Sequence, residues 1–334
     1  MRSSNIGGQA VMEGIMMRHK DKYSIAVRRP DQEIELKVED YKCIFGNHAF
    51  LKKPIIRGVV SFVDSLVVGT KCLMYSAEIA GDEEDEETAR KNEQLTEAER
   101  SAKKAKEDKQ FKWLLYITVA VSMVVSVAAF MFLPYVLASL IRGAGASEFM
   151  VTVVEAFVKL ALFMGYMFLI SRMKDIQRTF MYHGAEHKCI NCVEHGLPLT
   201  VENVLKSSRL HKRCGTSFLF LVMLVSIVLF FFIQVDNVAE KVILRILLMP
   251  VVAGISYEII RLAGRTDNVF IKILSAPGMW IQRMTTREPD ESMAEVAIAS
   301  VEAVFDWKKY LQDTFGYEVD ESWMKDDASA EPED

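Results

Sequence analysis

The sequence lacks several features that would assign it to a familiar class of protein. Its 334 residues include only five cysteines, an odd number that argues against a disulfide framework. Its net charge of −5 at pH 7 gives no indication of a nucleic acid or another polyanion as a partner. Residues 1–22 contain no continuous apolar stretch of the secretory signal type. We therefore expect reduced thiols and an internal segment that directs the chain to the membrane.

Long apolar runs dominate the middle of the chain, although the mean hydropathy is only +0.14. Crossing about 30 Å of hydrocarbon takes about 20 mostly apolar residues. Four runs are long enough: Trp113–Ile141, Phe149–Ile170, Phe218–Val235 and Val242–Ile260. Pro134 is an expected break in the first run, and Glu155 and Lys159 in the second are spaced to pair on a helix. They predict an α-helical polytopic membrane protein with about four transmembrane helices.

Lysine and arginine are distributed unevenly around these runs. They are concentrated before the first run, in the loop 171–217 and after the fourth run, whereas the two short connections carry about one each. Positively charged residues are retained on the cytoplasmic side. We therefore expect both termini and the 171–217 loop to be cytoplasmic, in a multi-pass protein of the cytoplasmic membrane.

The remaining residues divide by composition. Residues 1–81 combine a glycine motif with a small β module. In this module, residues 23–29 and 33–39 form a hairpin, and residues 42–45 are expected to add a further strand. The amphipathic pattern over 55–80 predicts a helix that lies either on the membrane surface or in a soluble core.

The boundaries of the other parts follow in the same way. The predicted parts are a charged linker with a helix start at 82–110, the membrane domain at 111–264, a cytoplasmic helical region at 265–320 that includes a broken interfacial helix over 269–284, and a disordered acidic tail at 321–334.

The main candidate for chemistry is the segment 183–187, which fits the inverted zincin pattern His-x-x-Glu-His. On a helix, His183 and His187 lie one turn apart, where two neutral imidazoles can bind one Zn²⁺. Glu186 lies beside them and is the expected general base for a metal-bound water. The alternative is that these histidines are interfacial residues that form hydrogen bonds with lipid or backbone.

A zinc site of this kind needs a third protein ligand. Glu258 is the first candidate, because a carboxylate within a membrane run is costly unless it has a partner. His211 is the second. Glu258 has an alternative role as the ion-pair partner of Arg261 or Arg265.

Other polar segments are weaker candidates. Cys189 and Cys192 could form a compact structural zinc site with His187 and His195, although this spacing would strain a tetrahedral geometry on one helix. The glycine-bounded segment 7–14 is expected to be a turn and not a phosphate loop, because it lacks the Lys-Ser/Thr ending. Further candidate site residues are Glu13, Arg213, Cys214, Arg287 and Glu288.

Several of these segments, in this order, resemble the YqhQ family of bacterial membrane proteins, a family of unknown function. The matching residues are Gly7–Gly14 with Met16–Arg18, Pro54 with Arg57-Gly58, His183–Lys188, His211 with Arg213–Phe218, Tyr257-Glu258, and Gln282-Arg283 with Thr285–Asp290. The resemblance implies a metal-dependent enzyme of the bacterial inner membrane. Cys189 and Cys192 are outside the family's pattern.

The interpretation that these features favour is a zinc-dependent membrane hydrolase, with peptidase activity on a membrane protein or peptide as its most natural chemistry. The alternative is a non-enzymatic scaffold, assembly factor or lipid- or partner-binding protein that docks through Arg213, Arg287 and the glycine segment. Both interpretations place the chain in the lipid bilayer and away from nucleic acid, and neither sets the oligomeric state.

Overall fold

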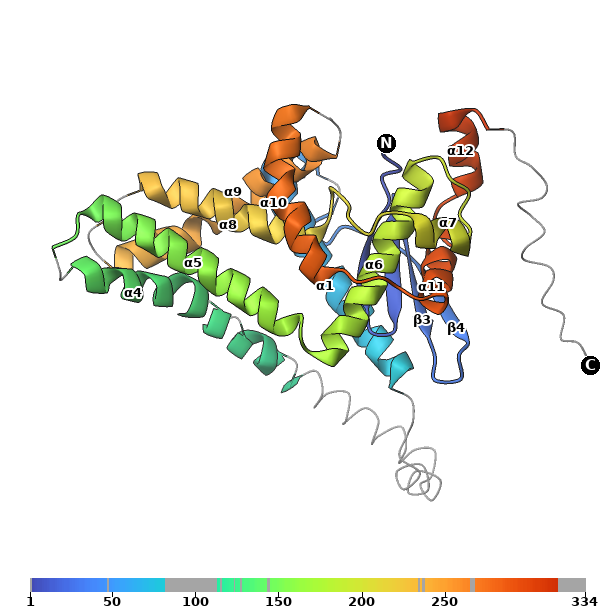
Figure 1. Cartoon of the computed structure of the whole chain (residues 1–334), viewed down its shortest axis with the longest axis horizontal. Coiled ribbons are helices and arrows are strands. Elements are labelled where there is room, and N and C mark those ends of the chain that lie inside the picture. Colours follow the sequence, from blue (N-terminus) through green and yellow to red (C-terminus); the bar gives the residue numbers. More distant parts are fainter. Residues whose placement is uncertain are drawn as a thin grey trace, which may run out of the picture. The chain divides into compact units, whose positions relative to one another are not determined.

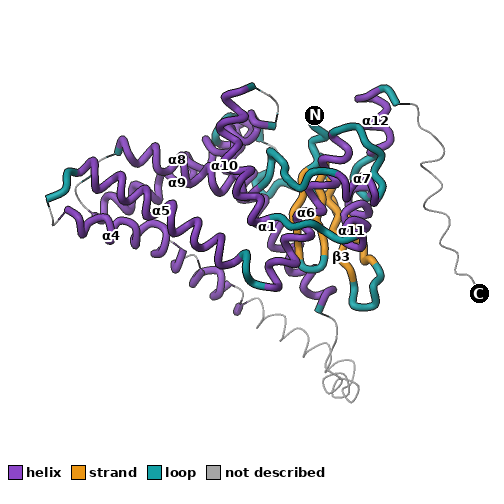
Figure 2. Tube along the Cα trace, viewed as in Figure 1, coloured by secondary structure: helices purple, strands orange, loops and turns teal. Residues whose placement is uncertain are grey.

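The computed structural model describes residues 2–46, 48–81, 113–114, 116–122, 124–126, 128–142, 145–233, 235, 238–264 and 268–317. The predicted linker 82–110 and the acidic tail 321–334 lie outside these residues. The chain divides into two compact units: residues 1–80, 170–225 and 250–334 form unit 1, and residues 81–169 and 226–249 form unit 2. The described strands all belong to unit 1 (Figure 1), and the described elements of unit 2 are helices (Figure 2).

A four-stranded antiparallel meander forms the N-terminal part of unit 1. Its strands are β1 (Gly7–Val11), β2 (Gly14–His19), β3 (Lys22–Arg28) and β4 (Ile34–Asp40), in sheet order β1-β2-β3-β4. The pairing of β3 with β4 confirms the predicted hairpin. Two details of the prediction were wrong: the glycine segment 7–14 supplies β1 and the first residue of β2, and residues 42–45 are not a strand.

The side chains of the sheet alternate between two cores, because successive residues of a strand point to opposite faces. Ile15 and Met17 of β2 and Ala26 of β3 belong to one buried cluster. Met16 and Ile25, their neighbours along the strands, belong to the other. Both faces of this small sheet are therefore covered.

The helix α1 (Ile56–Ala80), which follows the short η1 (Ala49–Lys52), covers one face. Its Cys72 is fully buried in the cluster that contains Met16 and Ile25, and Val68 and Tyr75 pack against the same cluster. Of the two alternatives for 55–80, these contacts support the helix of a soluble core. Its outer side remains apolar, with Leu66 and Leu73 exposed.

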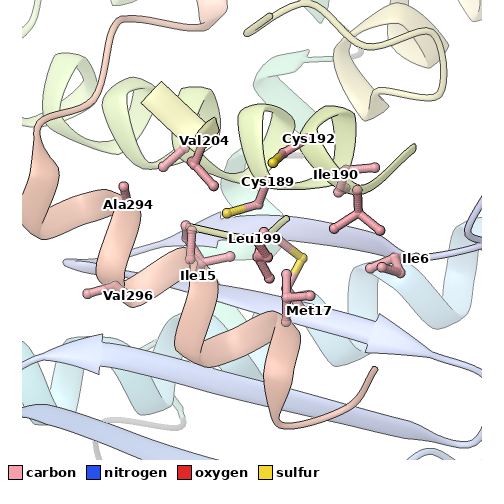
Figure 3. Close-up of a cluster of buried hydrophobic side chains, with 14 of the residues drawn as sticks. Ile6, Ile15, Met17, Cys189, Ile190, Cys192, Leu199, Val204, Ala294 and Val296 are labelled. Carbon is pink, nitrogen blue, oxygen red and sulfur yellow. The ribbon is translucent and has the colours of Figure 1, made fainter. Parts of the chain in front are cut away.

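The opposite face is covered by α6 (Lys174–Glu194) and α11 (Glu291–Glu302), with α7 (Val201–Lys206) and α12 (Trp307–Phe315) contributing to the same core. Figure 3 shows Ile15 and Met17 of the sheet in one cluster with Cys189 and Cys192 of α6. Both cysteines are fully buried there, as small apolar side chains. This packing gives no support to a structural zinc site built on them.

Five described helices are long and apolar enough to cross a membrane: α1, the segment Tyr116–Ile141, α5 (Glu148–Ile170), α8 (Gly215–Phe232) and α9 (Val238–Ala263). The chain is therefore a multi-pass membrane protein. A π-helical turn, η2 (Ala128–Phe132), lies directly before α4 (Leu133–Arg142), close to the break that we predicted at Pro134.

The predicted break in the segment 269–284 is wrong, because α10 (Val269–Thr285) continues through Pro277. Gly278 allows this helix to approach the beginning of α8 closely. A Cβ atom at Gly278 would lie 2.8 Å from the side chain of Ser217. The Pro-Gly pair therefore marks a close helix contact instead of a helix end.

Candidate metal centre

The His-x-x-Glu-His segment lies in the buried half of α6, which is enclosed from Tyr182 to Glu194. His187 is 1% exposed and Glu186 is 5% exposed, whereas His183 is only partly buried. The rings of His183 and His187 lie 4.4 Å apart between centroids, as expected for residues one helical turn apart.

A third potential ligand comes from a segment far along the chain. Cys214 directly precedes α8, and its Sγ lies 3.2 Å from Nε2 of His183. One ligand atom from each of His183, His187 and Cys214 lies within 4.8 Å of the other two. Among the His, Cys, Asp and Glu side chains of the described residues, these three are the ones that lie close enough together to hold a metal ion.

Hydrogen bonds fix how the two imidazoles face this group. Nδ1 of His183 lies 2.9 Å from the carbonyl oxygen of Thr285, and Nδ1 of His187 lies 2.7 Å from that of Arg209. A carbonyl oxygen can only accept, so each Nδ1 carries a proton and donates it. Each Nε2 therefore faces the group, and its lone pair can bind a cation once that nitrogen carries no proton, which is the usual arrangement behind metal-binding histidines.

Electrostatics favour the thiolate form of Cys214. Burial alone would raise the pKa of this thiol, but the neighbouring imidazoles of His183 and His187 outweigh burial and hold the pKa well below its usual range. Burial alone would lower the pKa of His183, whereas the Cys214 sulfur raises it to about 9. The pair thus shares a proton between a thiolate and an imidazole, and a metal cation could take the place of that proton.

Glu186 lies close to the two histidines without belonging to the group of three. Burial raises the pKa of its carboxyl, and the backbone N–H of Gly8 opposes this by lowering the pKa. A Cβ atom at Gly8 would lie 2.9 Å from Cγ of Glu186 and 2.7 Å from the carbonyl oxygen of Met16. The glycine segment therefore contributes to the site, because β1 can approach α6 at Gly8.

A second close approach holds the other side of α6. A Cβ atom at Gly184 would overlap the carbonyl oxygen of Arg287. The backbone N–H of Arg287 donates to the carbonyl of Phe180 at 2.9 Å, and its guanidinium donates to the carbonyl of Ser171 at 3.1 Å. The end of α10 and the segment after it are thus fixed along α6 beside the histidines, where Thr285, the last residue of α10, provides its carbonyl.

Glu258, the first candidate for a third ligand, is not in the group of three. Its carboxylate accepts two hydrogen bonds from the guanidinium of Arg57, one of them 2.7 Å from Nε to Oε1. Its predicted ion-pair partner was Arg261 or Arg265, of which Arg265 lies outside the described residues. The partner in the structure belongs instead to α1.

His211, the second candidate, also lies beside the group. Its ring centroid is 5.7 Å from that of His187, and its Nε2 lies 3.5 Å from Oε2 of Glu194. The backbone N–H of Arg213 lies 3.4 Å from Nδ1, which places the ring proton on Nε2, facing the carboxylate. His211 thereby supports the segment that carries Cys214.

The remaining candidate residues form ion pairs within unit 1. Glu13 pairs with Arg178, Arg213 pairs with Glu194, and Glu288 pairs with Lys188 at 2.9 Å and with Arg209 at 3.2 Å. Arg209 also supplies the carbonyl that holds His187. These residues surround the site without pointing a free ligand atom into it.

Two supporting residues were missed in the sequence. Glu194 is fully buried and accepts hydrogen bonds from Ser4, at 2.7 Å from the backbone N and 2.8 Å from Oγ, and from Arg213. Gln282 accepts from the backbone N–H of His211 and donates to its carbonyl, both at 2.8 Å. A glutamate at the end of a helix gave no signal of these long-range contacts, and Gln282 was named only among the residues that carry the family resemblance.

The fold and the site define a multi-pass membrane protein in which a small β-sheet unit carries a candidate His₂Cys metal centre. The chain belongs to the DUF1385 family, since residues 53–307 match the family described as a protein of unknown function (DUF1385). It is similar to the uncharacterized protein YqhQ of Bacillus subtilis (strain 168), with 37% identity over 299 residues, which are 88% of this chain and 90% of that protein. The resemblance to the YqhQ family is thus confirmed. No solved structure matches the chain.

Proposed function

We propose that this protein is a metal-dependent membrane hydrolase whose metal, most naturally Zn²⁺, is held by His183, His187 and Cys214. The observation that carries the proposal is the convergence of three ligand atoms with both imidazole Nδ1 protons already donated to carbonyls. Two imidazoles and a thiolate suit zinc, and three protein ligands leave the fourth position that a catalytic zinc site keeps open.

Glu186 is the proposed general base. A bound zinc ion would lower the pKa of a coordinated water and polarise a carbonyl. The carboxylate of Glu186 lies next to both histidines, outside the ligand group, so it is free to accept a proton. Because Cys214 directly precedes the candidate span α8, the proposed substrate is a peptide bond of a membrane protein or of a peptide at the membrane surface.

The alternative, a scaffold that docks through Arg213, Arg287 and the glycine segment, has less support. Arg213 forms an ion pair with Glu194, and the guanidinium of Arg287 donates to the carbonyl of Ser171. The glycine segment packs Gly8 against α6. All three features act inside unit 1, which leaves them little capacity to bind a partner.

Elemental analysis of the purified, detergent-solubilised protein tests the metal. We expect about one equivalent of zinc in the wild type and a loss of more than about 90% in His187→Ala and in Cys214→Ser, since two remaining ligands hold zinc poorly. Cys43→Ser, which changes a partly exposed cysteine away from the group, is the matched control and should keep its metal. A wild-type protein without stoichiometric metal contradicts the proposal.

A second variant separates the base from the ligands. Glu186→Gln keeps the size of the side chain and cannot accept the proton, so we expect full metal content together with loss of function. The readout is complementation of a strain from which the gene has been deleted, and it needs no known substrate. If Glu186→Gln binds zinc and complements as well as the wild type, the metal is structural and the hydrolase proposal is wrong.

A further inference from the structure

Helix α10 has an exposed apolar side that the candidate metal centre does not use. Val269 and Ile273 are each 66% exposed, and Trp280 is 55% exposed. Together with Ala276, which is also exposed, they follow the spacing i, i+4, i+7 and i+11, which aligns them on one face of a helix. We call these four residues the α10 stripe. Apolar side chains that are exposed in a continuous row, and not singly, indicate a surface that contacts another apolar phase.

The opposite side of α10 faces the candidate metal centre. Gln282 and Thr285 are fully buried there. The amide of Gln282 donates to the carbonyl of His211 at 2.8 Å and to Oγ of Ser217 at 2.7 Å. The carbonyl of Thr285 accepts from Nδ1 of His183. One helix therefore carries the supports of the site on one side and the α10 stripe on the other.

The chain holds α10 beside the ends of two candidate spans. Gly278 packs against Ser217, the third residue of α8, and α10 begins at Val269, shortly after α9 ends at Ala263. Two consecutive spans return the chain to the side of the membrane from which it started. The beginning of α8 and the end of α9 therefore lie on the same side, and α10 extends along the membrane boundary between them.

The charges of α10 suit a lipid surface. The sequence of the helix contains no aspartate or glutamate, and its two charged residues, Lys272 and Arg283, are both basic and exposed. They are eleven residues apart, which places them along the same edge of the α10 stripe. Long basic side chains at such an edge reach lipid phosphates while their stems lie on the hydrocarbon. A tryptophan such as Trp280 is also typical of this boundary.

We propose that α10 is a docking helix that lies parallel to the membrane, with the α10 stripe embedded in the lipid leaflet between headgroups and acyl chains. Lys272 and Arg283 contact the phosphates of the same leaflet. Because the other side of α10 holds His183 through Thr285 and His211 through Gln282, docking keeps the candidate metal centre beside the lipid surface. The docking requires no bound metal; only its use in bringing a membrane substrate to the centre rests on the proposed hydrolase function.

Spin labels on single cysteines measure the depth of α10 in the full-length protein, reconstituted into vesicles of phosphatidylethanolamine and phosphatidylglycerol. The background is Cys43→Ser, in which the other four cysteines are buried. The labelled variants are Val269→Cys, Ile273→Cys and Trp280→Cys, with Glu202→Cys in the exposed part of α7 as the matched control. Molecular oxygen is concentrated in lipid, whereas a polar nickel chelate is concentrated in water. We expect the ratio of oxygen to nickel collision rates to be on the order of tenfold higher in the α10 stripe than at Glu202→Cys, because a docked helix lies about 5–10 Å into the headgroup boundary.

The outcomes are distinct. Similar depths at all three positions of the α10 stripe support a helix that lies parallel to the membrane. Labels as open to nickel as Glu202→Cys show that water covers the stripe, and labels shielded from both reagents show that protein covers it; either result overturns the proposal. A steady change of depth from Val269→Cys to Trp280→Cys contradicts the parallel arrangement. All three positions are exposed, so each variant should fold, and the loss of one leaves two to decide. Protein without zinc should give the same depths, which separates this test from that of the hydrolase activity.

Discussion

Single glycines allow the closest packing in the metal centre, and Gly184 is the most demanding of them. It faces the carbonyl oxygen of Arg287, which a methyl group would overlap. Gly184→Ala should therefore destabilise the protein by about 1–3 kcal/mol, since α6 and the segment after α10 must move apart. We also expect Gly184→Ala to lower the metal content. Thr285, whose carbonyl oxygen orients His183, lies two residues before Arg287 and would move with it. Thermal unfolding and elemental analysis measure the two effects.

Gly165→Ala is the matched control for this change. It lies in the interior of α5, and a Cβ atom at this position would have no heavy atom within 4 Å. An alanine there should be neutral or stabilising by up to about 1 kcal/mol, because alanine restricts the unfolded chain and favours a helix. If the two variants have the same stability and metal content, the close approach at Gly184 does not exist.

Glu258→Gln tests the role of the carboxylate that the sequence favoured as a ligand. Because both its oxygens accept from Arg57, we expect this variant to keep its metal and to unfold at a lower temperature. Arg57→Gln should have the same effect, since it breaks the same pair. A loss of metal in Glu258→Gln alone would instead support the original prediction that this residue is the third ligand.

The sequence predicted the histidine pair because its geometry is local. Helical spacing alone brings His183 and His187 to one face. Cys214 was named only as a general candidate, since its contact depends on how the segment before α8 returns to α6. The carbonyls of Thr285 and Arg209 could not be predicted at all, because backbone acceptors leave no signature in the sequence.

At the scale of secondary structure, strong periodicity was a reliable guide and weak periodicity was not. The hairpin of β3 and β4 and the helices α5, α8 and α9 were predicted within a few residues. β1 was missed, because its sequence, Gly-Gly-Gln-Ala-Val, has few of the branched and aromatic residues typical of strands. For α1 two alternatives stayed open, since both its sheet-facing side and its outer side are apolar.

Two neighbouring substitutions test whether α1, which is long and apolar enough to span a membrane, packs as a core helix or crosses the bilayer. Cys72 is fully buried against the sheet, whereas Leu73 is 46% exposed. Cys72→Asp should destabilise the protein strongly, because it buries an unpaired charge. Leu73→Asp should have little effect on the unfolding temperature in detergent or on insertion into the membrane. In a lipid-facing transmembrane helix an aspartate costs about 2.5–3.5 kcal/mol, so poor insertion of Leu73→Asp would show that α1 crosses the bilayer.

At the scale of the whole molecule, the packing of unit 1 constrains how often the chain crosses the membrane. The sheet shares a core with α6 and with α11, so all three lie on one side. An even number of crossings must therefore separate the sheet from α6, and α6 from α11. Two crossings, by the segment Tyr116–Ile141 and by α5, would separate the sheet from α6. Two more, by α8 and α9, would separate α6 from α11. A crossing by α1 would make the first number odd, which supports four spans.

The distribution of lysine and arginine adds the direction: residues 171–217 and both termini should be cytoplasmic, and the connections at 143–147 and 236–241 should be outside. Labelling at single cysteines can test this orientation. Asn191, in the loop predicted to be cytoplasmic, is only 3% exposed and is a poor labelling position, and the possible positions Ala144, Asn237 and Asp326 lie outside the described residues. Glu202 in α7 and Ser147 before α5 are exposed and serve instead. Cys43→Ser provides the background, since the other four cysteines are buried.

In this background, a membrane-impermeant maleimide added to intact cells should label Ser147→Cys and leave Glu202→Cys unlabelled. In inverted membrane vesicles the pattern should reverse. Lys22→Cys, at the exposed beginning of β3, should behave like Glu202→Cys, because the sheet and α6 share a core. Labelling of Glu202→Cys from outside would contradict the orientation. Opposite behaviour of Lys22→Cys and Glu202→Cys would contradict the four-span arrangement itself, since the sheet and α6 would then lie on different sides of the membrane.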